Sequence, residues 1–275
     1  MKVVRANSAG FCFGVRRAYD LVNAAVQDFD EVQTFGDLIH NPEVLEELNS
    51  RGVRSISAIS KIRTGTVIIR AHGISDKKLF QLKKQGVKIV DASCPFVKKI
   101  HAAVAKFVVQ KIPVFIFGSK KHPELTAIFE DFSTAMAVKK FNPKIFQKFV
   151  GKKIGLLAQT TERSEKFLEF KNSLEKMGVK VFAQNTICGA TRERQNSAAA
   201  LAKKVDIMVV IGGKKSNNSK QLFDLVKNIT KSFWIESAKD LRKDWFRGCQ
   251  KVGISAGAST PEKVISQVCE KLKSL

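Results

Sequence analysis

The chain has 275 residues, of which 44% are hydrophobic, and it carries a formal net charge of +23. A chain of this size can bury the core of one large domain or of two to three small ones. We expect no signal peptide, because Lys2, Arg5 and Asn7 lie in the first ten residues, and no apolar run approaches the ~20 residues of a membrane span. Five cysteines are an odd number, which argues against a disulfide framework. We therefore expect a soluble cytoplasmic protein whose thiols stay reduced.

The net charge of +23 does not by itself identify a partner. The lysines are dispersed in short pairs, such as Lys83-Lys84 and Lys214-Lys215, and they form no basic tail. With one Tyr and two Trp, few rings are available to stack on bases. A nucleic-acid footprint should cluster on one face, so nucleic acid is an unlikely partner. A lysine-rich solvated surface is favoured, and an anionic substrate or an acidic protein partner stays open.

Short apolar strands alternate with helices along the whole chain. In the first part we expect strands at Lys2–Ala6, Val32–Phe35, Val67–Arg70 and Val87–Val90, and helices at Val15–Asp28, Pro42–Arg51 and Asp76–Gln85. In the second part we expect strands at Val114–Phe117, Ala135–Val138, Ile154–Ala158 and Val179–Ala183, and helices at Phe96–Gln110, Glu124–Asp131, Pro143–Val150 and Arg163–Met177. In the third part we expect strands at Ile207–Ile211, Phe233–Ile235 and Val252–Ser255, and helices at Thr191–Lys204, Lys220–Lys231 and Pro261–Lys273. This alternation predicts βαβ units with parallel sheets.

Three cysteines share one structural setting. Cys12, Cys94 and Cys188 each stand where an expected strand gives way to an amphipathic helix, at near-equal intervals. The spacing predicts an α/β fold of three small units with mainly parallel sheets around a shared centre, with boundaries at 14–93, 94–187 and 188–275 (with 1–13). Three thiolates meeting there would form a soft metal site with one coordination position open, and such a site often carries out chemistry at the metal.

The other two cysteines are interpreted as structural. Cys249 lies in the polar stretch "FRGCQK" with no adjacent ligand type, and Cys269 falls on an apolar helical stripe with Val264, Val268 and Leu272. A buried cysteine behaves as a small hydrophobic residue. Neither position therefore indicates a metal ligand.

Polar motifs cluster at the carboxyl ends of the expected strands, where open α/β sheets place their ligands. They are "GDLIHNP" with His40, "IIRAHG" with His72, "IFGSKKHPE" with His122 and Glu124, "LLAQTTE" with Thr160 and Thr161, "VVIGGKKSNNS" with Ser216 to Ser219, and "VGISAGAST" with Ser259 and Thr260. Hydroxyl, amide and imidazole groups in such loops bind phosphate oxygens. Glu124 is suited to donate a proton beside a metal site, especially if burial raises its pKa. His101, in mid-helix, is interpreted as structural.

In their order along the chain, these motifs resemble the LytB/IspH family, the hydroxymethylbutenyl diphosphate reductases of the non-mevalonate (MEP) isoprenoid pathway. The resemblance covers nearly the whole chain, through "GFCFGVRRA", "LIHNPEV", "RAHGIS", "DASCPFVKKIH", "GSKKHPE", "QTT", "NTICGATRERQ", "KSNNS" and "GISAGASTPE". The cysteine motifs and "AHG" are its most specific parts.

The resemblance implies both a cofactor and a reaction. It implies three α/β domains in a pseudo-three-fold arrangement around one [4Fe-4S] cluster, held by Cys12, Cys94 and Cys188 and seen as [3Fe-4S] after oxidation. It implies an iron–sulfur oxidoreductase that dehydroxylates (E)-4-hydroxy-3-methylbut-2-enyl diphosphate, an allylic diphosphate, to isopentenyl and dimethylallyl diphosphate. Two electrons and two protons would be delivered at the open iron. The net charge favours an acidic electron donor of the ferredoxin or flavodoxin type.

The resemblance also implies roles for individual residues. The diphosphate would be held by a set of polar side chains, namely His40, His72, Ser216, Asn217, Asn218 and Ser259, with His122 nearby. Glu124 would deliver protons, Thr160 would orient the substrate hydroxyl, and His122 would also belong to this catalytic set. Asn217 departs from the family, which commonly has a second serine there. The amide of Asn217 is bulkier than a serine hydroxyl, but it can still donate to a phosphate oxygen.

Two alternatives stay open at this point. One is another three-cysteine cluster enzyme resembling quinolinate synthase, whose substrates are carboxylates; "HPE", "AHG" and "KSNNS" disfavour it. The other is a basic nucleic-acid-binding protein with a structural metal, and the absence of C-x2-C spacing counts against it.

Overall fold

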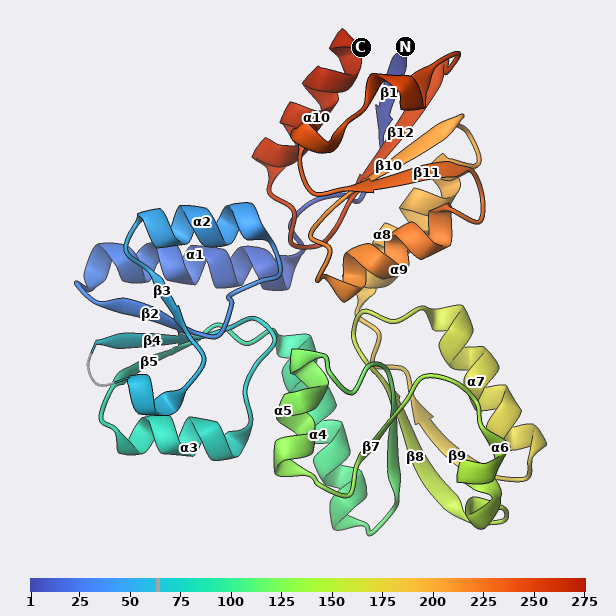
Figure 1. Cartoon of the computed structure of the whole chain (residues 1–275). Helices are drawn as coiled ribbons and strands as arrows, with labels where there is room; N and C mark the ends of the chain where they lie inside the picture. Colours follow the sequence, from blue (N-terminus) through green and yellow to red (C-terminus); the bar gives the residue numbers. More distant parts are fainter. Residues whose placement is uncertain (63–64) are drawn as a thin grey trace. The chain divides into compact units, whose positions relative to one another are not determined.

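The computed structural model describes residues 1–62 and 65–275 (Figure 1). Within these ranges, strands and helices alternate, and the strands pair in parallel in every named sheet. No helix in the described part of the chain is long and apolar enough to cross a membrane. The α/β class with mainly parallel sheets, predicted from the alternating pattern, is therefore confirmed.

The strands form three four-stranded sheets within the described ranges. The first sheet contains β2 (Val32–Phe35), β3 (Arg54–Ile56), β4 (Thr66–Ile69) and β5 (Lys88–Asp91). The second contains β6 (Val114–Phe117), β7 (Met136–Val138), β8 (Lys153–Ala158) and β9 (Lys180–Gln184). The third contains β1 (Lys2–Arg5), β10 (Ile207–Ile211), β11 (Lys231–Ile235) and β12 (Lys251–Ala256).

Helices connect the strands. They are α1 (Phe13–Asp28), α2 (Pro42–Ser50), α3 (Asp76–Lys84), α4 (Pro95–Val109), α5 (Pro123–Asp131), α6 (Pro143–Phe146), α7 (Ser164–Lys176), α8 (Gly189–Ala202), α9 (Asn217–Val226) and α10 (Glu262–Ser274). Short 3₁₀ turns occur at η1 (Ile59–Lys61), η2 (Gln147–Phe149), η3 (Ala238–Asp240) and η4 (Lys243–Phe246).

One strand order recurs in all three sheets. It is β3-β2-β4-β5 in the first sheet and β7-β6-β8-β9 in the second, so the first strand of each set lies between its second and its third. The third sheet, β11-β10-β12-β1, has the same order, and the N-terminal strand takes the fourth, edge position. Because all strands are parallel, their carboxyl ends lie along one edge of each sheet. The three sheets are therefore variants of one α/β plan.

By its internal contacts, the chain divides into two compact units. Unit 1 comprises residues 1–16, 39–50 and 189–275, and unit 2 comprises residues 17–38 and 51–188. Unit 1 thus holds the third sheet, whereas unit 2 holds the first and the second. The three boundaries expected from the cysteine spacing stay a prediction, as does their placement around a shared centre.

Apolar side chains alternate between the two faces of each strand, so each sheet is buried on both sides. In the second sheet, Ile116 and Leu157 pack with α4 and α5, whereas Phe115 and Leu156 pack with α6 and α7. In the third sheet, Val210 packs with α8 and α9, and the opposite face packs with α10 (Figure 1). This burial on both faces explains why the strands are near-continuous apolar runs in the sequence.

One strand was not predicted and one predicted helix has other bounds, each for a local reason. Strand β3 was not predicted, because it is an edge strand whose Arg54 and Ser55 are exposed, so no apolar run marks it. The helix expected at Lys220–Lys231 begins earlier, at Asn217, because the Ser216 side chain accepts a hydrogen bond from the backbone N–H of Ser219 and so caps it. It ends at Val226, and Lys231 already begins β11.

Candidate active site

Cys12, Cys94 and Cys188 occupy equivalent positions in the three sheets. Each follows the fourth, edge strand of its sheet, and each is half-buried. Each backbone N–H also donates to a carbonyl in the loop after the third strand of the same sheet. The acceptors are Ala258 for Cys12 (3.1 Å), Ala71 for Cys94 (2.9 Å) and Thr160 for Cys188 (3.1 Å). The sequence repeat therefore corresponds to a repeated backbone contact that fixes each cysteine at the carboxyl edge of its sheet.

The chemistry of these three residues fits an iron–sulfur cluster. Thiolates are the usual ligands of such clusters, and these three are neither sealed in an apolar core nor fully exposed. Cys94 is the N-cap of α4, with Pro95 in the first turn, and its side chain does not cap the helix. The sulfur is therefore not engaged as a helix cap.

The remaining cysteines have different surroundings. Cys249 and Cys269 pack against the apolar core between the third sheet and α10. Burial raises the pKa of both thiols, and for Cys249 the nearby Asp206 carboxylate raises it further. A raised pKa keeps a thiol protonated and a poor metal ligand. Their interpretation as structural residues stays a prediction.

An arginine that sequence reasoning missed holds the loop before Cys94. The Arg17 guanidinium donates to the backbone carbonyls of Asp91 (3.1 Å) and Ser93 (3.3 Å). The Asp91 side chain accepts from the Ser93 N–H (2.9 Å) and pairs with Lys98. The arginine pair in "GVRRA" was the only signal for this contact, and it does not specify a partner.

Glu124 is a buried carboxyl of unit 2. It lies in the first turn of α5 and is 1% exposed. Its Oε1 accepts from the Thr160 N–H (3.0 Å) and its Oε2 from the Thr160 hydroxyl (2.7 Å). Burial raises the pKa of Glu124 to about 7, although the two hydrogen bonds from Thr160 oppose that rise. The side chain therefore exchanges a proton near neutral pH, as a general acid must.

Two histidines of unit 2 lie close together. His122 is buried and is the N-cap of α5, where its Nδ1 accepts a hydrogen bond from the Glu124 N–H at 3.3 Å. With Nδ1 as an acceptor, Nε2 carries the proton of the neutral ring. The His72 ring meets the His122 ring edge-on, with 5.4 Å between centroids. Gly73 follows in a left-handed conformation (φ +73°), which explains the glycine of "AHG".

Unit 1 contains a second group of polar residues at the N-terminus of α9. Ser216 and Asn218 are buried there, and Asn217 is half-buried. The Asn218 amide nitrogen has no hydrogen-bond partner within the described residues. The Ser259 hydroxyl donates to the His40 carbonyl at 3.1 Å, which places the loop after β12 beside the "IHNP" segment. A helix N-terminus with a buried, unpaired amide donor is suited to bind an anion.

Glycines allow the close approaches that build this group. A Cβ on Gly213 would lie 2.7 Å from the His40 carbonyl oxygen, and a Cβ on Gly257 would lie 2.2 Å from the Ser219 hydroxyl. The loops after β10 and β12 therefore reach the N-terminus of α9 and residue 40 only without side chains at these positions. The sequence signal for this was the glycine content of "IGGKK" and "SAGAS".

The structure distributes the predicted site residues over both units. In unit 2 it brings together His72 and His122, and it connects Glu124 and Cys188 through Thr160. In unit 1 it brings together His40, Ser216, Asn218 and Ser259, and it fixes Cys12 beside the loop after β12.

Some supporting residues had not been predicted. Arg194 is buried in unit 1 and donates to the Gly10 carbonyl at 2.6 Å, just before Cys12. In unit 2, Gln159 is fully buried and accepts from the Ser119 N–H at 3.0 Å, and Glu162 is buried opposite Lys139 at 3.6 Å. These residues hold the loops that carry the predicted site.

Comparison with known proteins agrees with these observations. The model of the LytB protein family matches residues 3–273. The chain belongs to the LytB family. The match extends through all three sheets, and so includes every cysteine-bearing strand end described above.

Individual LytB relatives are similar over their full length. A 4-hydroxy-3-methylbut-2-enyl diphosphate reductase of Nautilia profundicola is 39% identical over 279 residues, covering 100% of both chains. The enzyme of the same name from Campylobacter lari is 40% identical over 276 residues, covering 99% of this chain and 98% of the relative. That from Aquifex aeolicus is 37% identical over 278 residues, covering 99% and 96%.

Solved structures are also similar to this LytB chain. One is described as (E)-4-hydroxy-3-methyl-but-2-enyl diphosphate reductase, the terminal enzyme of the non-mevalonate pathway; it is 38% identical, with a TM-score of 0.73 and 100% of both chains covered. The corresponding reductase of Plasmodium falciparum is 24% identical, with a TM-score of 0.90, and covers 100% of this chain and 87% of the relative. At that identity the second likeness shows the fold alone.

Proposed function

We propose that this LytB chain is a 4-hydroxy-3-methylbut-2-enyl diphosphate reductase, the last enzyme of the non-mevalonate isoprenoid pathway. Its reaction is the reductive dehydroxylation of (E)-4-hydroxy-3-methylbut-2-enyl diphosphate to isopentenyl and dimethylallyl diphosphate. Relatives with this name align with the whole chain at 37% identity or more. The observation that carries the proposal is the Glu124–Thr160 pair. Glu124 is a buried carboxyl with a pKa of about 7, and its partner Thr160 also accepts a hydrogen bond from the backbone N–H of Cys188.

The three cysteines of the sheet edges are the proposed cofactor ligands. Cys12, Cys94 and Cys188 would hold one [4Fe-4S] cluster, which supplies electrons and an open Lewis-acid iron when it is bound. The repeated N–H contact of the three residues supports this assignment, since it gives each sulfur the same backbone setting. Cys249 and Cys269 are left out, because burial raises the pKa of both thiols.

The diphosphate is proposed to bind to hydrogen-bond donors and a helix dipole. In unit 1, the N-terminus of α9 offers Ser216, Asn217 and Asn218, with Ser259 and His40 beside it. In unit 2, His122 accepts a hydrogen bond at Nδ1, so its ring carries a proton on Nε2, and His72 lies against the same ring. Such groups bind phosphate oxygens through hydrogen bonds and partial charge.

Proton delivery is assigned to Glu124. Overall, two electrons and two protons cleave the allylic carbon–oxygen bond; one proton leaves with the hydroxyl as water and the other ends on carbon. With a pKa of about 7, Glu124 is about half protonated near neutral pH, so it has a proton to give. The Thr160 hydroxyl, which donates to Glu124 at 2.7 Å, can pass the proton onward and orient the substrate hydroxyl.

The electrons are proposed to come from an acidic protein of the ferredoxin or flavodoxin type. The net charge of +23 favours attraction of such a donor. The proposed setting for this exchange is the cytoplasm, where the thiols stay reduced.

The deciding experiment combines metal analysis with turnover. After anaerobic purification, we expect a brown protein with iron and sulfide in the ratio of a [4Fe-4S] cluster, and reduction of the hydroxylated diphosphate. Cys12→Ser, Cys94→Ser and Cys188→Ser should each lose iron and activity, because a serine oxygen replaces a thiolate poorly. Cys249→Ser and Cys269→Ala are the matched controls and should keep both. A folded, colourless wild-type protein without turnover would overturn the proposal.

A further inference from the structure

The two sheets of unit 2 are joined by hydrogen bonds between the C-terminal end of α5 and the N-terminal end of α3. The Glu130 carboxylate accepts from the Ser75 hydroxyl (2.7 Å) and from the Lys78 ammonium (2.5 Å). The Asp131 carboxylate accepts from the backbone N–H groups of Asp76 (2.7 Å) and Lys77 (3.2 Å). The Lys77 ammonium also donates to the Glu130 carbonyl at 2.6 Å. We call these contacts the α3–α5 clamp.

The carboxylates of Glu130 and Asp131 stabilise the N-terminus of α3 rather than their own helix, α5. Two carboxylates at a helix C-terminus are unfavourable for the dipole of their own helix, but they are favourable at the N-terminus of another. Here Asp131 satisfies two of the N–H groups that α3 leaves unpaired. Burial alone would raise the pKa of Glu130, but the hydrogen bonds from Lys78 and Ser75 bring it below its usual value. Glu130 is therefore an anion throughout the neutral range.

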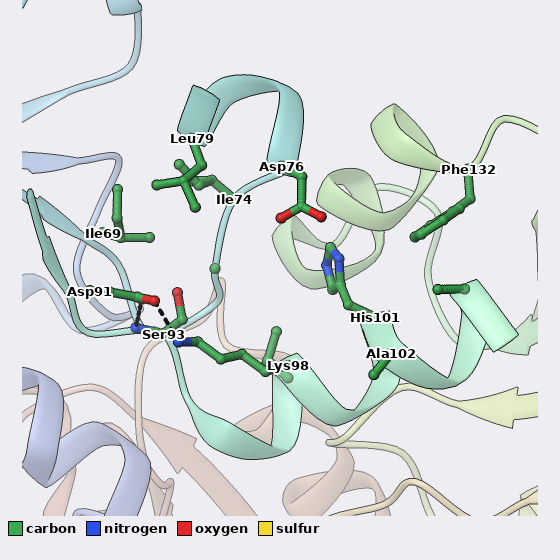
Figure 2. A pocket seen from close by; sticks show the side chains of 13 residues that line it. Ile69, Ile74, Asp76, Leu79, Asp91, Ser93, Lys98, His101, Ala102 and Phe132 are labelled. Atoms are coloured by element: carbon green, nitrogen blue, oxygen red, sulfur yellow. Dashed lines mark hydrogen bonds and ion pairs between the residues drawn. The ribbon is translucent and has the colours of Figure 1, made fainter. Parts of the chain in front are cut away.

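Apolar packing between the two sheets is incomplete beside the clamp. A cavity of about 370 Å³ lies between the end of β4, α3 and α4, with Ile69, Leu79 and Phe132 among its lining. Figure 2 shows Asp76 and His101 facing each other on one side of this cavity and the Asp91–Lys98 pair on the other. The side chain of Asp131 is 7% exposed. The clamp thus connects the sheets at a place where side-chain packing leaves space.

Each helix of the clamp is preceded by a site histidine, directly in α5 and at a distance of a few residues in α3. His72 stands three residues before Ser75, the N-cap of α3, and it lies in a turn that the Gly73 N–H closes by donating to the Arg70 carbonyl at 2.9 Å. His122 is the N-cap of α5, the helix that ends at Asp131. Because only two residues separate His72 from the N-cap of α3, we expect a shift of α3 along α5 to change the 5.4 Å separation of the two imidazole rings.

We propose that Glu130 and Asp131 are positioning residues, which set the spacing of His72 and His122 through the α3–α5 clamp and so set the affinity for the diphosphate. This inference rests on the proposed function, in which the two histidines bind phosphate oxygens. A displaced donor loses much of its hydrogen bond to a phosphate oxygen, and such a bond to a charged group is worth roughly 10- to 100-fold in affinity. Because the diphosphate does not react, the loss should appear in binding rather than in the chemical step.

The test uses the cluster-loaded enzyme and inorganic pyrophosphate as the probe. Asp131→Asn places an amide N–H₂ against one of the α3 N–H groups, and Glu130→Gln weakens the contact with Lys78. Calorimetry should show pyrophosphate binding weakened about tenfold in each variant, and KM for the substrate raised by a similar factor while kcat changes by less than about twofold. Glu175→Gln removes a carboxylate from the exposed Lys171–Glu175 pair of α7 in the same unit and should leave all three values unchanged.

A double-mutant cycle separates positioning from a general loss of structure. If Asp131 acts through His72, Asp131→Asn should weaken pyrophosphate binding much less in a His72→Asn background than in the wild type. Equal weakening in both backgrounds, no weakening at all, or failure of both clamp variants to fold would each overturn the inference. Absence of pyrophosphate binding or turnover in the wild type would instead overturn the proposed function, so the two failures are distinguishable.

Discussion

The Glu124 carboxylate accepts two hydrogen bonds from one residue, Thr160: the backbone N–H donates to Oε1 at 3.0 Å and the hydroxyl to Oε2 at 2.7 Å. The carbonyl of Thr160 in turn accepts the Cys188 N–H at 3.1 Å. Because burial raises the pKa of Glu124 and Thr160 lowers it, the balance near pH 7 depends on Thr160. A single residue therefore tunes the proposed acid and holds a proposed cluster ligand.

Thr160→Val tests this balance. The variant removes the hydroxyl hydrogen bond but keeps the backbone one, and it favours the neutral carboxyl, so the pKa of Glu124 should rise above about 7. A hydrogen bond to a charged group is worth about 1.5–3 kcal/mol, which corresponds to roughly one to two pH units. The alkaline limb of the kcat profile, where the acid loses its proton, should shift upward accordingly, and kcat itself should fall.

The control for this shift is Thr161→Val. Thr161 is the next residue, and its hydroxyl accepts from the Gln159 side chain at 2.8 Å instead of contacting Glu124. Its pH profile should keep the wild-type limb. An unchanged limb in Thr160→Val would show that the hydroxyl does not set the pKa of the proposed acid, Glu124.

Glu124→Gln separates proton delivery from binding. The amide keeps the shape of the side chain and can still pair with Thr160, but it has no acidic proton. We expect kcat to fall by about 10² or more, the usual range for loss of a general acid, while pyrophosphate affinity changes little. Intact kcat with a raised KM would assign Glu124 to binding instead.

The same substitution should stabilise the fold at alkaline pH. A carboxyl whose folded-state pKa is raised to about 7 favours folding in its protonated form, and this advantage is lost as pH rises through the folded-state pKa. At pH 8 the wild type folds with a buried charge that Gln lacks, so Glu124→Gln should be more stable by about 2–3 kcal/mol. The gain should shrink toward pH 5. Urea unfolding at both pH values measures it, and a gain independent of pH would contradict the buried-charge explanation.

The strands and the cysteine positions could be predicted from the sequence because they have local signals. In the sequence, each cysteine ends an apolar run and precedes a helical pattern. In the structure, Cys12, Cys94 and Cys188 each follow an edge strand and precede a helix. Strand β3 has no such signal, since Arg54 and Ser55 are solvent-exposed at an edge. Local patterns thus identify buried elements and miss an exposed one.

The contacts within the site could not be predicted, because they depend on strand order. Glu124 follows β6 and Thr160 follows β8, and the two residues meet only because these strands are neighbours in the sheet. The sequence shows that both strands exist but not that they pair. The same holds for Arg17, whose carbonyl acceptors at Asp91 and Ser93 lie more than 70 residues away.

The net charge leads to a prediction about electron delivery. In unit 2, the first turn of α4 after Cys94 exposes Phe96, Lys98 and Lys99, and the Lys99 ammonium lies 5.3 Å from the centroid of the Phe96 ring. An acidic donor approaching the sulfur of Cys94 would meet these positive charges, which accelerate association most at low ionic strength. Turnover with a ferredoxin or flavodoxin should therefore decline steeply as added salt reduces the screening length below ~10 Å.

Two controls decide whether that decline reflects docking of the donor. Turnover with a small uncharged reductant should depend much less on salt, because no charged surface has to meet the protein. Lys99→Gln should lower the rate with the protein donor by more than Lys176→Gln, which removes an equally positive, exposed side chain from the last turn of α7. Since transient redox complexes gain mainly in association rate from charge, the loss should appear in kcat/KM for the donor and vanish at high salt. Equal salt dependence with both reductants would mean that the lysines do not accelerate association with the donor and only form a solvated surface.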